Sequence, residues 1–83
     1  MNTRSDPIRT GQTIRALREA YGWTQIGFAE ALGLSGSHMT NIEAGRRACT
    51  PRTALRIANL LGVPLAAITT DFTPAEITRV HAA

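Results

Sequence analysis

The stretch that most constrains this chain covers residues 24–45, where two short helices are expected on either side of a tight turn. Thr24 and Ser35 are suited to begin these helices, because their hydroxyls can accept from backbone N–H groups that a first turn leaves unpaired. Gly33 lies between them and can adopt the left-handed conformation of a sharp turn. Large apolar residues supply the seam between the helices: Phe28, Leu32, Leu34, Met39 and Ile42. The pattern predicts a helix-turn-helix unit, the second helix of which can enter a DNA major groove.

Apolar residues on either side of the two caps are spaced as hydrophobic staples, contacts that fix how the chain enters a helix. Trp23 and Phe28 form the expected staple of the first helix, and Leu34 and Met39 form that of the second. Ala29 is small at the point where the second helix must cross closely. The caps, the turn and the staples therefore predict the same arrangement.

The residues outside this unit are expected to form helices that begin at caps and end at glycines. A first helix is expected over residues 7–21, after an Asp6 cap, with three residues on its apolar face: Ile14, Leu17 and Tyr21. Thr50 caps a helix over residues 51–61 with four apolar residues at helical spacing: Ala54, Leu55, Ala58 and Leu61. A short fifth helix is expected over residues 64–68. The chain is thus predicted to be an all-α, compact five-helix domain.

The last residues carry a helix signal of their own. Thr73 is a suitable N-cap, Pro74 stands at the first helical position, and Phe72 and Ile77 are spaced as a staple. A last short helix is therefore expected over residues 74–81. The expected organisation has three parts: a flexible N-terminal arm over residues 1–7, a helix-turn-helix domain over residues 8–69, and a C-terminal tail over residues 70–83.

Composition favours one small domain in a reducing compartment. Of the 83 residues, 43% are hydrophobic, which is enough to form a core. The single Cys49 excludes an internal disulfide and a zinc site built from several cysteines. No apolar run approaches the roughly 20 residues that span a bilayer, and the first residues lack the apolar core of a signal peptide. We therefore expect a cytoplasmic protein that does not enter a membrane.

Positive charge is concentrated in the first two thirds of the chain. The net charge is +3, and all nine Lys+Arg positions are arginine, a bias that GC-rich codon usage explains. Eight of the nine lie at or before Arg56. A guanidinium group matches phosphate and guanine edges. The asymmetry predicts a basic binding face and a nearly neutral, apolar C-terminal end.

Several fragments, in this order, make the chain similar to the phage repressor/Cro family of XRE-type helix-turn-helix proteins. The fragments are Leu17-Arg18, Gly22-Trp23-Thr24-Gln25, Phe28-Ala29, Leu32-Gly33-Leu34-Ser35, Ile42-Glu43-Ala44-Gly45 and the run over residues 55–63. The likeness covers roughly residues 8–68. It implies a lambda-repressor-like fold whose partner is double-stranded DNA.

The resemblance also implies that the start of the third helix and a residue one turn later face the bases. Carried over to this sequence, these positions are Gly36, Ser37 and Asn41, with Thr40 beside them. Asparagine suits a bidentate contact with adenine, and serine can pair with several base edges. Gly36 departs from the family, in which a long polar side chain is common. The alternatives are a solvated helix residue at Asn41 and support of the cap at Ser37.

Contacts with DNA phosphates are predicted at the start of the second helix and after the third. The family places a phosphate contact at the position of Gln25, and His38 lies beside the same surface. Arg46 and Arg47 directly follow the third helix, and Arg52 comes shortly after them, so all three are candidates for the flanking phosphates. The alternatives are packing for His38 and solvated loop charge for the arginines.

A further role that the resemblance implies is an ion pair between Arg18 and Glu43, which would join the first helix to the third. Such a pair would hold the recognition helix at its angle. If the pair is buried, removal of one partner should cost roughly 3–5 kcal/mol. Cys49 is expected to fill the loop after the third helix. The alternative for Cys49 is redox sensing, which would need a lowered thiol pKa.

No catalytic motif emerges from the sequence, which contains no nucleophile elbow, phosphate-binding loop or His-Glu-His helix motif. We therefore predict that the protein is not an enzyme and needs no cofactor or metal. The prediction is a repressor-type transcriptional regulator that binds a near-palindromic operator as a homodimer. The alternative is a protein-interaction module, such as an antitoxin or adaptor. The dimer surface is expected at the apolar end, unless its residues close the core: Leu65, Ile68, Phe72, Ile77 and Val80.

Overall fold

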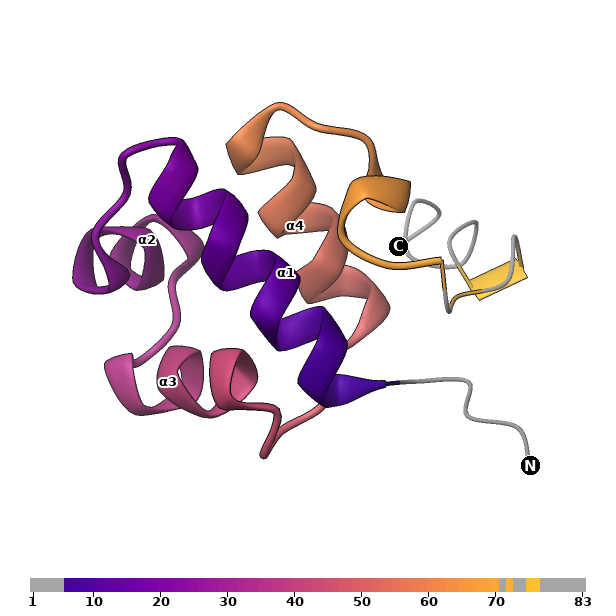
Figure 1. Ribbon diagram of the computed structural model, residues 1–83, viewed down its shortest axis with the longest axis horizontal. Coiled ribbons are helices and arrows are strands. Elements are labelled where there is room, and N and C mark those ends of the chain that lie inside the picture. Colours follow the sequence, from indigo (N-terminus) through magenta and orange to yellow (C-terminus); the bar gives the residue numbers. More distant parts are fainter. Residues whose placement is uncertain (1–5, 71, 73–74, 77–83) are drawn as a thin grey trace.

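The computed structural model describes residues 6–70, 72 and 75–76, and these residues form helices and connecting turns without strands (Figure 1). The elements are α1 (Pro7–Ala20), α2 (Gln25–Leu32), α3 (Gly36–Ala44), α4 (Pro51–Leu61) and the 3-10 turn η1 (Leu65–Ala67). The all-α prediction is therefore confirmed, but with four α-helices and one 3-10 turn in place of five helices.

Each α-helix begins at the side chain that the sequence predicts as its cap. In every case the side chain accepts from the N–H group three residues later, and the caps are Asp6, Thr24, Ser35 and Thr50. At the other end, α2, α3 and α4 each stop at a glycine with a φ between 72° and 80°. These local signals explain why the helix boundaries were predictable to within one residue.

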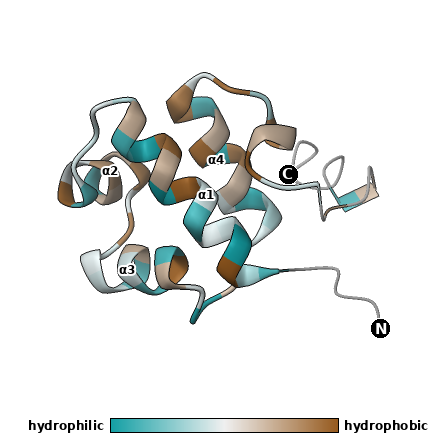
Figure 2. Ribbon diagram, viewed as in Figure 1, coloured by the Kyte–Doolittle hydropathy of each residue, from teal (hydrophilic) through white to brown (hydrophobic). Residues whose placement is uncertain are grey.

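The core lies where α1 crosses the other helices. α1 packs against α3 and α4, α2 packs against the same two helices, and α4 also packs against η1. Figure 2 shows brown, hydrophobic bands on α4, whereas the exposed start of α3 is pale. The largest fully buried side chains come from all four helices: Phe28, Ile14, Met39, Ile42 and Ile57.

The inward faces of α1 and α4 differ from the predicted ones at one residue each. Tyr21 lies just beyond α1 with 55% of its surface exposed, and the buried face of α1 continues through Arg18 instead. In α4, Ile57 is fully buried where Leu55 was expected, and Leu55 is only half-buried. Ile14 and Leu17 of the predicted α1 face do pack in the core, and only Tyr21 was placed there wrongly, because apolar spacing does not indicate a buried arginine.

The predicted fifth helix is wrong, because residues 64–68 form only the single turn η1. Its hydrogen bonds run from Ala67 N to Pro64 O and from Ile68 N to Leu65 O, the i to i+3 pattern of a 3-10 turn. Pro64 has no side chain that could cap the turn. Of the helix expected over residues 74–81, the structure describes only residues 75–76, which are helical.

Gly11 sets the close approach of α1 to α3. A Cβ atom at Gly11 would lie 2.6 Å from the backbone oxygen of Glu43 and closer still to that of Ile42. Real Cβ atoms do not approach backbone this closely, so only glycine permits the observed crossing. The contact brings α1 directly against the C-terminal half of α3.

Candidate nucleic-acid interface

The turn between α2 and α3 has the geometry of a helix-turn-helix unit. Gly33 adopts a φ of 72°, and Leu34 N donates to Ala29 O at 2.9 Å, which closes the end of α2. Trp23 and Phe28 form the predicted staple, with ring centroids 5.5 Å apart in an edge-to-face arrangement. The entry to α2 and its exit towards α3 are therefore both fixed by local contacts.

The two sides of α3 differ completely in burial. Met39 and Ile42 face inward and are almost fully buried, at 0% and 1% exposure. The predicted base-contact residues lie on the other side, where Gly36, Ser37 and Thr40 are exposed. The cap of α3 is Ser35, which accepts from His38 N at 3.0 Å. The side chain of Ser37 is therefore not needed as the cap and is exposed on the outer side of α3. Asn41 and His38 are half-buried, between the exposed and the buried sides of the helix.

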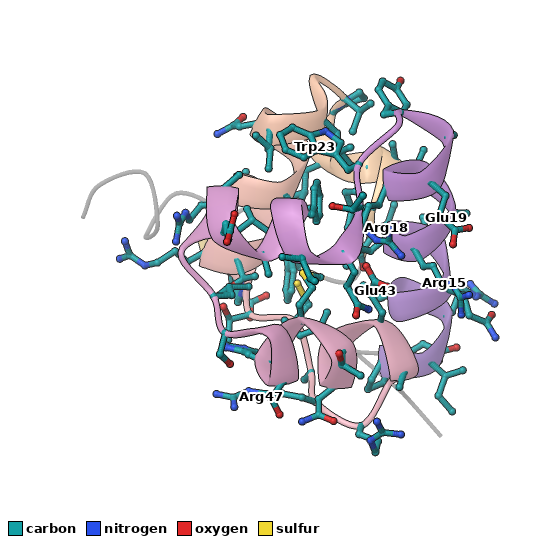
Figure 3. The ribbon with its side chains drawn as sticks, turned by 90° about the vertical axis from the view of Figure 1, so that its left-hand side faces the viewer. Arg15, Arg18, Glu19, Trp23, Glu43 and Arg47 are labelled. Carbon is teal, nitrogen blue, oxygen red and sulfur yellow. The ribbon has the colours of Figure 1, made fainter. Side chains whose placement is uncertain are left out.

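The predicted ion pair joins α1 to α3 in the interior. Arg18 Nε and Nη2 donate to the two carboxylate oxygens of Glu43, at 2.7 Å and 3.2 Å, and both residues are 7% exposed. Arg18 Nη1 donates to Trp23 O at 2.9 Å, so the guanidinium also fixes the entry to α2. Its hydrogen bond to Glu43 raises the pKa of Arg18. Figure 3 shows the two side chains meeting between the helices.

Gln25 extends this ion pair to the surface of α3. Its Nε2 donates to Glu43 Oε1 at 3.0 Å, and its Oε1 accepts from the Thr40 hydroxyl at 3.1 Å. The predicted phosphate residue is thus also a link between the buried pair and an exposed residue of α3. Sequence reasoning missed this link. We call the four side chains the recognition network: Arg18, Glu43, Gln25 and Thr40.

The arginines after α3 lie on the surface beside this helix. Arg46 Nε donates to Asn41 Oδ1 at 3.0 Å, a contact that the sequence did not indicate. It leaves the Asn41 Nδ2 hydrogens for another acceptor. Arg47 and Arg52 are exposed, and Figure 3 shows Arg47 projecting beyond α3. No described carboxylate lies within ion-pair distance of these three arginines.

Arginines on α1 are engaged differently. Arg9 pairs with Asp6 at 3.8 Å and Arg15 with Glu19 at 3.3 Å, and all four side chains are largely exposed. Exposed pairs of this kind contribute little to stability. They do, however, offset the positive charge of α1 locally. Among the described residues, the arginines without an ion-pair partner therefore lie after α3 and in α4.

The apolar residues predicted as a dimer surface are divided by the structure. Ile68 is only 4% exposed and belongs to the core, so its prediction as an interface residue is wrong. Leu65 and Phe72 are half-buried against that core. Ile77 and Val80 lie outside the described residues. Ile68 is buried in the core because η1 folds back onto α4.

Cys49 fills the loop after α3, as expected. It is 8% exposed, and burial raises the pKa of its thiol from the ordinary 9.0 to about 12. The thiol is therefore held neutral, which is the opposite of what redox sensing needs. Within the described residues, no cluster of three or more potential metal ligands occurs, and no helix is long and apolar enough to cross a bilayer.

Comparisons with known proteins match this geometry. A family model described as a helix-turn-helix domain matches residues 9–69. The uncharacterised HTH-type transcriptional regulator YazB of Bacillus subtilis (strain 168) is 54% identical over 37 residues, which cover 45% of this chain and 54% of YazB. The chain thus spans about half the length of this curated relative.

Solved structures extend the likeness to the whole domain. The restriction-modification controller protein C.AhdI from Aeromonas hydrophila is 30% identical, with a TM-score of 0.71 over 76% of this chain and 96% of that chain. The clp gene regulator ClgR from C. glutamicum shares the fold at 21% identity, with a TM-score of 0.71 over 86% and 90% of the two chains. The DNA-binding domain of BldD does so at 24% identity, with a TM-score of 0.67 over 82% and 97%.

These matches agree with the helix-turn-helix geometry of α2 and α3, and they describe a family of regulators and not of enzymes. The chain belongs to the XRE-type helix-turn-helix family of DNA-binding transcriptional regulators.

Proposed function

We propose that this protein is a repressor that binds a near-palindromic operator as a homodimer, with α3 in the major groove. The observation that carries the proposal is the polar, exposed side of α3, a helix that the ion pair of Arg18 and Glu43 joins to α1 on its buried side. A helix presented in this way can bring Ser37, Thr40 and Asn41 to the base edges.

Residues around α3 are placed to contact the DNA phosphates on either side of the proposed base contacts. Arg46, Arg47 and Arg52 follow α3 without neutralising partners among the described residues, and Gln25 lies at the N-terminus of α2. Backbone N–H groups at a helix start add favourable interactions with an anion. His38, half-buried in α3, completes the proposed phosphate-facing set.

Dimerisation is proposed because one unit of this size reads only a few base pairs. Two recognition helices enter successive major grooves when their half-sites lie about 34–36 Å apart. Of the residues predicted for a dimer surface, Leu65 and Phe72 remain available, since each is only half-buried.

Selection of bound duplexes from a random pool, at near-physiological salt with competitor DNA, tests the proposal. We expect a two-fold symmetric site whose half-sites are about one helical turn apart. Asn41→Ala should change the recovered site, whereas Asn59→Ala, the same change at an exposed position of α4, should not. Recovery of no motif, with binding that disappears as salt rises, would leave only phosphate attraction and favour a protein-interaction module.

A further inference from the structure

The recognition network assigns a direction to each of its hydrogen bonds, beginning at the buried carboxylate. Glu43 accepts two bonds from Arg18, at 2.7 Å and 3.2 Å, with its side chain only 4% exposed. A carboxylate paired with a guanidinium is an acceptor only. Any other side chain that contacts Glu43 must therefore turn a donor towards it.

Gln25 is that other side chain, so the orientation of its amide is fixed. The group that lies 3.0 Å from Glu43 Oε1 must be the Nε2 amine, which places Oε1 on the opposite side. That oxygen lies 3.1 Å from the hydroxyl of Thr40. A flipped amide would bring two oxygens together at Glu43, so the electrostatics exclude it.

Thr40 is consequently the donor in its bond with Gln25. A hydroxyl has one hydrogen and two acceptor lone pairs, and the hydrogen is used by Gln25 Oε1. Thr40 is exposed on the outer side of α3. What its oxygen offers outward is thus acceptor capacity alone.

We propose that Thr40 selects a base-pair position where an amino group faces it, N6 of adenine or N4 of cytosine, and that Gln25 is the positioning residue that imposes this choice. The inference rests on the proposed function, because it requires α3 in the major groove. Amino groups are the donors at base edges there, whereas the carbonyls of guanine and thymine are acceptors and would meet the lone pairs of Thr40. The second Nε2 hydrogen of Gln25 stays available for a phosphate.

Three substitutions in the full chain test the proposal by selection from random duplexes. Thr40→Val keeps the side-chain shape without the hydroxyl, and Thr40→Ser keeps the hydroxyl. Gln25→Met keeps the length without the amide, which releases the Thr40 hydrogen. Thr13→Val makes the same chemical change on α1, where Thr13 lines a pocket with Ala67 and Ile68, and serves as the control.

The parent protein should select adenine or cytosine at one position of each half-site. Thr40→Val should lose that preference, Thr40→Ser and Thr13→Val should keep it, and Gln25→Met should also accept guanine or thymine there. Removal of the amino group from the selected base, for example purine in place of adenine, should lower the DNA affinity of the parent by about three- to tenfold. The same removal should leave the DNA affinity of Thr40→Val unchanged.

Two results would overturn the inference while the proposed function stands: the same motif for the parent and Thr40→Val, or a strict amino preference retained by Gln25→Met. Failure of the parent to select any motif would instead refute the proposed function, and the inference with it. A merely structural role of Gln25 would change affinity for all sites equally, so the base preference at one position separates the two roles.

Discussion

The two helices that flank the helix-turn-helix unit are attached to it in opposite ways. The buried polar and charged residues of the described chain all belong to α1 or α3: Thr10, Arg18 and Glu43. α4 buries only apolar side chains, Ala54, Ile57, Ala58 and Leu61. Apolar packing is not directional, whereas a bidentate ion pair fixes an orientation. The comparison indicates that α4 supplies stability and that α1 sets the direction in which α3 points.

The strongest way to break the polar attachment is to remove one of its partners. Glu43→Ala leaves the buried Arg18 guanidinium without its carboxylate, which should lower the free energy of unfolding by about 3–5 kcal/mol. Urea denaturation followed by circular dichroism measures this loss. Glu30→Ala, at an exposed position of α2, should change the same quantity by less than about 0.5 kcal/mol. A loss at Glu43 no larger than this control would contradict the account.

The matching change on the apolar side is Ile57→Ala. Ile57 is fully buried, and its truncation should cost about 2–5 kcal/mol through lost burial and a cavity. Ile26→Ala is the control, because Ile26 is 72% exposed. At temperatures where Ile57→Ala stays folded, its preferred DNA sequence should equal that of the parent. An altered preference would show that α4 also directs α3.

Gly11→Ala tests the attachment of α1 at the point where it crosses α3. The added Cβ would meet the backbone oxygens of Ile42 and Glu43, so α1 and α3 must separate at a cost of about 1–3 kcal/mol. Gly36→Ala is the matched control, since nothing lies within 4 Å of the added atom. Thermal unfolding distinguishes the two, and equal midpoints would argue against a close crossing.

The smallest expected effect concerns Cys49 in alkaline solution. Burial raises the pKa of its thiol to about 12 in the folded state, against 9.0 ordinarily, so the unfolded chain loses its proton first. The contribution of the neutral thiol to the free energy of unfolding is therefore fully present below pH 9 and decreases as the pH rises towards 12. Between pH 8 and pH 10 the parent should lose about 1 kcal/mol more than Cys49→Ala. Parallel unfolding curves for the two proteins at both pH values would refute a buried neutral thiol.

Local signals made most of the fold predictable. The caps at Thr24 and Ser35, the left-handed turn at Gly33 and the staple of Trp23 with Phe28 act within a few residues, so sequence spacing specifies them. The turn η1 was mistaken for a helix because five residues beginning with a proline resemble a helix start without having enough length to propagate.

Within the site, the predicted pair of residues is present, whereas a link between three helices was not predicted; the DNA contacts stay predictions. Arg18 and Glu43 were paired correctly through family resemblance. The bonds of Gln25 to Glu43 and Thr40 span 18 and 15 residues and depend on how α2 crosses α3, which no spacing reveals. The same is true of Ile68, whose burial depends on η1 folding back onto α4.

The most direct test of the central claim is the operator affinity of the double variant Arg18→Met/Glu43→Leu. Apolar side chains of similar volume can replace a buried ion pair with little or no loss of stability. The free energy of unfolding of the double variant should therefore be close to that of the parent and well above that of Glu43→Ala. Because the directional contact is gone, its affinity for the selected operator should nevertheless fall at least about tenfold, or about 1.4 kcal/mol. A folded double variant that binds the same operator with the affinity of the parent would contradict the claim that the polar network orients α3.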